Sequence, residues 1–131
     1  MVLFSQSHCV CNPRRPDGGC KNYQTATYQC IRPGELWQCN WLEETGTICS
    51  LVYDIKCNKI TTCLGFSIGH WANAEQAHGD KRNPADFQRW RELAKQGHQA
   101  DRYVLSEQAD ICERYHGKGE LEPIEESWPT L

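Results

Sequence analysis

The chain has 131 residues, which suits one domain or one domain with an added helical segment. Its formal net charge is −3, and residues 66–131 hold eight Lys and Arg against twelve Asp and Glu. The sequence therefore lacks the basic stripe or basic domain that is typical of nucleic-acid-binding proteins. No apolar run approaches the roughly 20 residues that a membrane-spanning helix needs. We expect neither nucleic acid nor a membrane as a partner.

The first nine residues, MVLFSQSHC, lack the basic start and the apolar core of a secretory signal peptide. Met1 is the only methionine, so it is either the start of an intracellular protein or an expression start placed before a mature secreted chain. Dense cysteines without the usual metal spacing favour the second interpretation, because disulfides persist in oxidising compartments. The expected location is secreted, and the alternative is cytoplasmic.

Residues 23–68 are rich in β-branched and aromatic side chains and are interrupted by turn residues. Pro33-Gly34 is typical of a type II turn between two strands. Short strands at such regular spacing predict an antiparallel β-meander. Its four expected strands are residues 25–31, 36–42, 47–55 and 59–68.

Two helices are predicted to follow. Residues 83–97 have Asn83 as N-cap, Pro84 at the first helical position and a stop at Gly97. Residues 106–117 run from a Ser106 cap to Gly117, and the remaining tail is acidic. The predicted fold class is α+β, with a cysteine-rich β-domain over residues 1–68 and a helical segment with an acidic tail over residues 69–131, packed on the first.

Eight of the nine cysteines lie in the first 63 residues, an even number that four disulfides would need. The turn at Pro33-Gly34 places Cys30 opposite Trp37 and Cys39 opposite Tyr28, so these two cysteines do not face each other. The ninth, Cys112, leaves a cysteine-linked dimer open beside a monomer. The disulfide candidates are Cys9, Cys11, Cys20, Cys30, Cys39, Cys49, Cys57 and Cys63.

We expect no cofactor. The alternative is a zinc ion held by cysteines and histidines, although the Cys-x-x-Cys knuckle of many zinc sites is absent. Cys112 and His116 are four residues apart on the predicted second helix, where two ligands would project from one face. We favour the other interpretation of this spacing, a packed cysteine beside a surface histidine. The alternative metal ligands are His8, Cys9, Cys11, Cys57, Cys63, Cys112 and His116.

Catalytic patterns are weak: the sequence has no nucleophile elbow or phosphate loop, and Cys112 lies away from any expected helix N-terminus. We therefore expect no enzyme activity. The five tryptophans favour binding instead. Trp37 and Trp41 alternate to one face of their strand with Cys39, either as core or, together with Trp71, as an exposed aromatic platform for a protein or a carbohydrate.

Tyr28-x-Cys30 and Trp37-x-Cys39 form a repeated aromatic-x-cysteine pattern within residues 20–63. In this pattern the chain resembles the small secreted cysteine-rich effector proteins of plant-pathogenic rust and mildew fungi. The resemblance implies a non-catalytic protein that acts on a host protein, with its cysteines in disulfides or, in some rust effectors, on zinc. The expected function is thus a secreted effector-type binding protein. The alternatives are a zinc-stabilised interaction domain and a carbohydrate-binding module.

Overall fold

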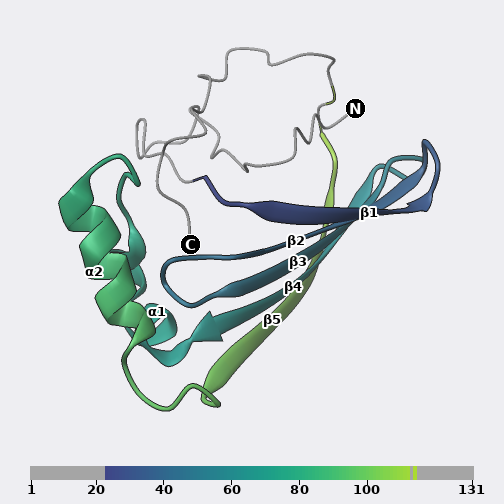
Figure 1. Cartoon of the computed structure of the whole chain (residues 1–131). Coiled ribbons are helices and arrows are strands. Elements are labelled where there is room, and N and C mark those ends of the chain that lie inside the picture. Colours follow the sequence, from purple (N-terminus) through teal and green to yellow (C-terminus); the bar gives the residue numbers. More distant parts are fainter. Residues whose placement is uncertain (1–22, 113, 115–131) are drawn as a thin grey trace.

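A computed structural model of the chain describes residues 23–112 and residue 114. They form one five-stranded antiparallel sheet in the order β1-β2-β3-β4-β5, with helices inserted between β4 and β5 (Figure 1). The strands are β1 (Ala26–Arg32), β2 (Leu36–Leu42), β3 (Ile48–Asp54), β4 (Lys59–Ser67) and β5 (Arg102–Asp110). The helices are α1 (Ile68–Ala72), the 3-10 helix η1 (Ala74–Ala77) and α2 (Pro84–Ala94).

The predicted fold class, a four-stranded meander followed by two helices, is wrong: the described residues form mostly a five-stranded antiparallel sheet with short helices. The sheet has five strands and not four, because residues 102–110 pair with β4 where a helix was expected over residues 106–117. The last strand of the sheet thus comes from the segment that was expected to be helical. Main-chain hydrogen bonds offered by the open edge of β4 outweigh a modest helix propensity in this segment. Cys112 lies beyond the strand and not on a helix, whereas His116 and the acidic tail lie outside the described residues.

The hairpin register follows from the turns. Gly34 and Gly46 take positive φ angles of 72° and 78°, which glycine adopts without strain at tight turns. Within the first hairpin Tyr28 pairs with Cys39 and Cys30 pairs with Trp37. The prediction that Cys30 and Cys39 are offset is therefore confirmed.

The two faces of the sheet differ in character. On β2, Trp37, Cys39 and Trp41 point to one face, and this face continues through Leu51 on β3 and Leu64 on β4. Cys39 is buried, and the two tryptophans are half-buried. The opposite face is mostly polar; its central rows contain Gln38, Asn40, Ser50, Thr61, Ser106 and Gln108.

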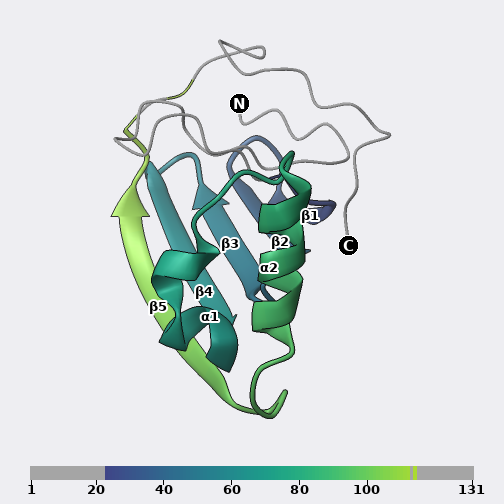
Figure 2. The same cartoon turned by 90° about the vertical axis from the view of Figure 1, so that its left-hand side faces the viewer.

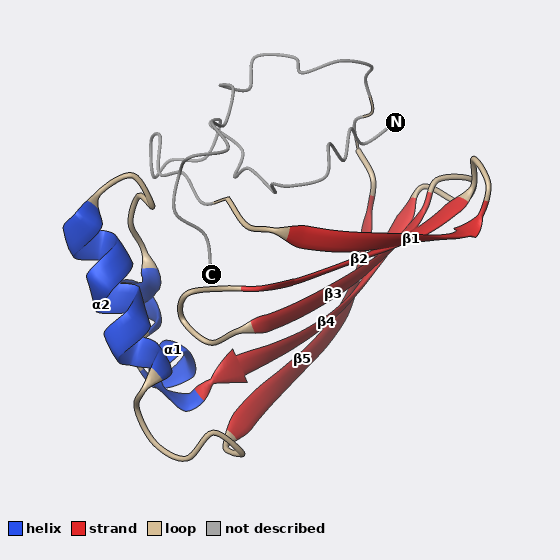
Figure 3. Ribbon diagram, in the orientation of Figure 1, coloured by secondary structure: helices blue, strands red, loops and turns tan. Residues whose placement is uncertain are grey.

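The helices lie at one end of the sheet, as Figures 2 and 3 show. Ring contacts of His70 and Trp71 with Phe66 place α1 against the first of these faces, which we call the helix face. α2 begins as expected: the Asn83 side chain accepts a hydrogen bond from the Ala85 amide, and Pro84 occupies the first turn. Its buried side chains are Trp90 and Leu93. No helix among the described residues is long and apolar enough to cross a membrane.

Candidate binding surface

A buried charged cluster lies beneath the helices and joins three distant segments. Lys81, in the loop before α2, pairs with Glu44, and both side chains are almost fully buried. The Lys81 ammonium also donates to the Tyr23 carbonyl oxygen and to Gln24 Oε1, the latter at 3.2 Å. It lies 4.4 Å from the centroid of the Tyr23 ring, within the range of a cation–π contact. The ammonium therefore has an ion-pair partner and two hydrogen-bond acceptors, as a buried charge requires.

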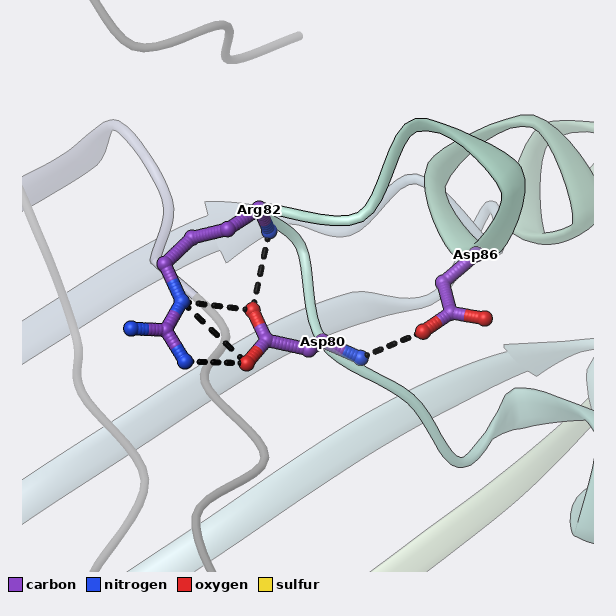
Figure 4. Close-up of polar contacts among 3 residues, drawn as sticks. All are labelled: Asp80, Arg82 and Asp86. Atoms are coloured by element: carbon purple, nitrogen blue, oxygen red, sulfur yellow. Dashed lines mark hydrogen bonds and ion pairs between the residues drawn. The ribbon is translucent and has the colours of Figure 1, made fainter.

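The loop that inserts Lys81 is held by its neighbours. The Asp80 carboxylate accepts from the Arg82 amide at 2.9 Å and from Arg82 Nε at 2.9 Å (Figure 4). The Asp80 amide donates to Asp86 Oδ2 at 2.9 Å, which ties the loop to the first turn of α2. This amide and the Arg89 guanidinium lower the pKa of Asp86. Lys81 is thus directed inward by a rigid loop.

Desolvation sets the electrostatics around the cluster. Burial lowers the pKa of Lys81, and the adjacent Glu44 carboxylate opposes this effect by stabilising the ammonium. Burial raises the pKa of Glu43, whose carboxylate accepts from Trp41 Nε1 at 3.2 Å and from Cys49 Sγ at 3.6 Å. Because the Lys81 side chain is 0% exposed, no substrate reaches it in this conformation. The arrangement serves to fix the loop and the helices on the sheet.

His70 of α1 extends this polar region toward the sheet. Its Nδ1 lies 2.7 Å from the Thr47 hydroxyl, and its ring meets Phe66 edge-on with the centroids 4.9 Å apart. Burial lowers the pKa of His70, and nearby His78 lowers it further. A neutral imidazole therefore suits this position.

Six exposed large apolar residues lie at the same end of the sheet, on both of its faces and on α1. Leu42 pairs with Ile48, and Ile48 lies in one row with Gly65 and Val104 on the polar face. On the helix face, Tyr103 stacks on Trp71 with the ring centroids 3.5 Å apart. Because Tyr103 and Val104 are neighbours on the outermost strand, the set continues around the edge of the sheet. We call it the apolar band; its members are Leu42, Ile48, Ile68, Trp71, Tyr103 and Val104.

Exposure distinguishes the band from the core. Val104 is 62% exposed, Ile48 54%, Trp71 45% and Tyr103 41%, although all four are large and apolar.

Of the three tryptophans singled out from the sequence, only Trp71 belongs to the apolar band; Trp37 and Trp41 are half-buried on the helix face. Tyr103 and Val104 are absent from the predicted site residues because their segment is not among the predicted strands. The β-prone run YVL at residues 103–105 is the signal that could have identified it.

The candidate cysteines are distributed over the sheet and its turns. No disulfide joins any two of the six cysteines in the described part of the chain: Cys30, Cys39, Cys49, Cys57, Cys63 and Cys112. Burial raises the pKa of Cys39. Within residues 23–112 and 114, no group of three or more His, Cys, Asp or Glu side chains could hold a metal ion. His8, Cys9, Cys11 and Cys20 lie outside the described residues.

No protein-family model and no curated protein was found to match this sequence.

Proposed function

We propose that the protein is a secreted, non-catalytic binding protein of the effector type that acts on a host protein through the apolar band. The observation that supports this most strongly is the gathering of large, exposed apolar side chains at one end of the sheet, around β5. Contiguous exposed apolar surface on a small domain is typical of a protein interaction site. Tryptophan and tyrosine are also enriched at the centres of such interfaces.

The support beneath the band suits this role. Trp71 is held by α1, whose first turn is capped by the Ser67 side chain accepting from the His70 amide. Phe66 of β4 packs against Trp71 with the ring centroids 5.6 Å apart. Tyr103 and Val104 are fixed by their pairing with Phe66 and Gly65 of β4. A rigid aromatic surface loses little conformational entropy when a partner binds.

The test compares two charged variants on the same face of the sheet. Ile48→Lys with Val104→Lys places two charges in the band, and Thr61→Lys with Gln108→Lys places two on the polar rows as a matched control. We expect the band variant to lose at least about tenfold in affinity for a protein that the wild type recovers from plant extract and that binds again after purification. The control variant retains the affinity.

Both variants are first compared by urea unfolding, because all four positions are exposed and their stabilities are expected to agree within about 1 kcal/mol. Equal affinity of the two folded variants for the purified partner would contradict a role for the band. Equal loss in both would show that the polar rows contribute to binding as much as the band does.

Carbohydrate is the second candidate ligand, favoured by the exposed Trp71 stacked on Tyr103. A sugar ring would pack on the outward face of this pair. Chitin or glucan oligomers would then quench tryptophan fluorescence in the wild type and not in Trp71→Ala. Unchanged fluorescence in the wild type would remove this candidate.

A further inference from the structure

The segment after β5 runs beside the turn that joins β3 to β4. Lys59 pairs with Asp110 in the β4–β5 register, and their side chains form an ion pair at 2.5 Å. One residue further, the Ile111 amide donates to the Asn58 carbonyl oxygen at 2.8 Å. Arg114 Nη1 then donates to the Ile55 carbonyl oxygen at 3.0 Å. The antiparallel alignment of β4 and β5 therefore continues past the end of the strand.

This alignment brings two cysteines opposite each other. Continuing the pairs Lys59–Asp110 and Asn58–Ile111 by one step places Cys57 opposite Cys112. The contact of Arg114 with Ile55 closes the same alignment on the far side. A main-chain contact on one side and the Arg114 side chain on the other thus hold the segment after β5 beside the turn that contains Cys57.

The main-chain hydrogen bond beside the two cysteines favours a bond between them. Because the Ile111 amide donates to the Asn58 carbonyl oxygen, the cysteines next to these two residues start from backbone positions that are held close together. Disulfides span Cα separations of roughly 4.4–6.8 Å. Cys57 lies in a turn and Cys112 lies beyond β5, so a small backbone adjustment breaks no hydrogen bond of the sheet. Both side chains are exposed and open to a reagent.

We propose that Cys57 and Cys112 are an oxidisable dithiol, at which a low-molecular-weight disulfide installs a covalent link between the β3–β4 turn and the end of β5. One cysteine thiolate attacks a sulfur of the small disulfide, which releases one small thiol and leaves a mixed disulfide on the protein. The second thiolate then attacks the protein sulfur of that mixed disulfide and releases the other small thiol. Two electrons pass from the protein to the reagent, and the two thiol protons end on the two small thiols.

The order of attack follows from the surroundings of Cys57. Hydrogen bonding to the Asp54 carboxylate raises the pKa of the Cys57 thiol. The Cys57 amide also donates to Asp54 Oδ1 at 2.9 Å, so the carboxylate is held beside the thiol by the turn itself. Less thiolate is present on Cys57 at neutral pH, and Cys112 therefore makes the first attack. Cys57 resolves the mixed disulfide.

The test treats the full, reduced and folded chain with oxidised glutathione, blocks remaining thiols and digests it with trypsin without reductant. Cleavage after Lys56, Lys59, Arg102 and Arg114 yields peptides 57–59 and 103–114, each with one cysteine. The expected product is these two peptides joined, with a mass about 2 Da below their sum. Cys63→Ser, which changes another exposed cysteine of the sheet, should give the same product.

Cys57→Ser and Cys112→Ser each abolish the joined peptides. In Cys57→Ser we expect a stable mixed disulfide between Cys112 and glutathione. In Cys112→Ser we expect Cys57 to react more slowly with oxidised glutathione than Cys112 does in Cys57→Ser. Either cysteine joined to a different cysteine, or lasting mixed disulfides on both in the wild type, would overturn the proposal. Because no binding partner is involved, the result does not depend on the function of the apolar band.

Discussion

The two ends of the sheet contain the same kinds of ion pair in opposite surroundings. At the end covered by the helices, Lys81 and Glu44 are paired with almost no exposure of either side chain. At the opposite end, around the β1–β2 turn, Glu35 pairs with Lys56 at 3.1 Å and with Arg32 at 3.2 Å in contact with solvent. The two ends therefore differ in how far their ion pairs are removed from water.

This difference matters for stability because of desolvation. An exposed pair gains little over the hydration that each charge already has in water, and its contribution is about 0–1 kcal/mol. A buried pair has given up that hydration, so removing one partner leaves a charge that nothing else compensates. The buried end is therefore sensitive to single substitutions, and the exposed end is tolerant.

The largest expected effect is that of Lys81→Met, which leaves the Glu44 carboxylate buried without its cation. We expect a loss of about 3–5 kcal/mol in the free energy of unfolding, measured by urea denaturation. Lys56→Met is the matched control at the exposed end and should cost less than about 1 kcal/mol. Similar losses in the two variants would show that burial does not make the ion pair at one end more important for stability than the pair at the other.

The double variant Lys81→Met with Glu44→Gln sharpens this test. Removing the second charge should recover much of the lost stability, because Gln24 can still bond to the amide at position 44. No recovery would mean that Lys81 acts through packing and not through its charge.

The next effect is that of Gly69→Ala in α1. A Cβ atom at this position would lie 1.9 Å from the Leu93 carbonyl oxygen, so α1 and α2 would have to move apart. We expect a loss of about 1–3 kcal/mol in the free energy of unfolding. Gly65→Ala is the matched control in β4, because its new Cβ would meet Ile48 at an ordinary 3.9 Å. Equal stability of the two variants would contradict the close contact of the helices.

The smallest expected effect is the contribution of His70 to the pH dependence of the free energy of unfolding. Because its pKa is lowered in the folded chain, the unfolded chain takes up a proton first as the pH falls below about 6.5. The stability that neutral His70 contributes is complete above this pH and is lost as the pH falls toward the folded pKa. Between pH 7 and pH 5 the free energy of unfolding of His70→Gln should fall by less than that of the wild type, with a difference of roughly 1 kcal/mol or less. An unchanged pH dependence in His70→Gln would contradict this role of His70.

Local signals were sufficient for the first part of the fold. The Pro33-Gly34 turn gave the correct pairing of Cys30 with Trp37, and Asn83 with Pro84 gave the start of α2. These features depend on residues close together in the sequence. Turn geometry and helix capping act over a few residues, so the sequence alone reveals them.

The missed features depend on residues far apart. β5 becomes a strand because β4, which ends at Ser67, offers an open edge to it. Its outward positions are exposed, so the alternation of apolar and polar residues that indicates a strand is weak. Lys81 and Glu44 likewise gave no signal, because a buried pair forms only when the loop before α2 folds over the β2–β3 turn.

The late position of β5 in the chain has a consequence for how the molecule assembles. β1 to β4 are joined by short turns, whereas β5 pairs with β4 only after the chain has passed through α1, η1 and α2. Closing that longer loop costs more chain entropy, so we expect β5 to join the sheet last in folding and to exchange its amide protons first. Two residues of the apolar band, Tyr103 and Val104, belong to this strand. A partner that binds there would stabilise the element that is completed last, and would slow its opening.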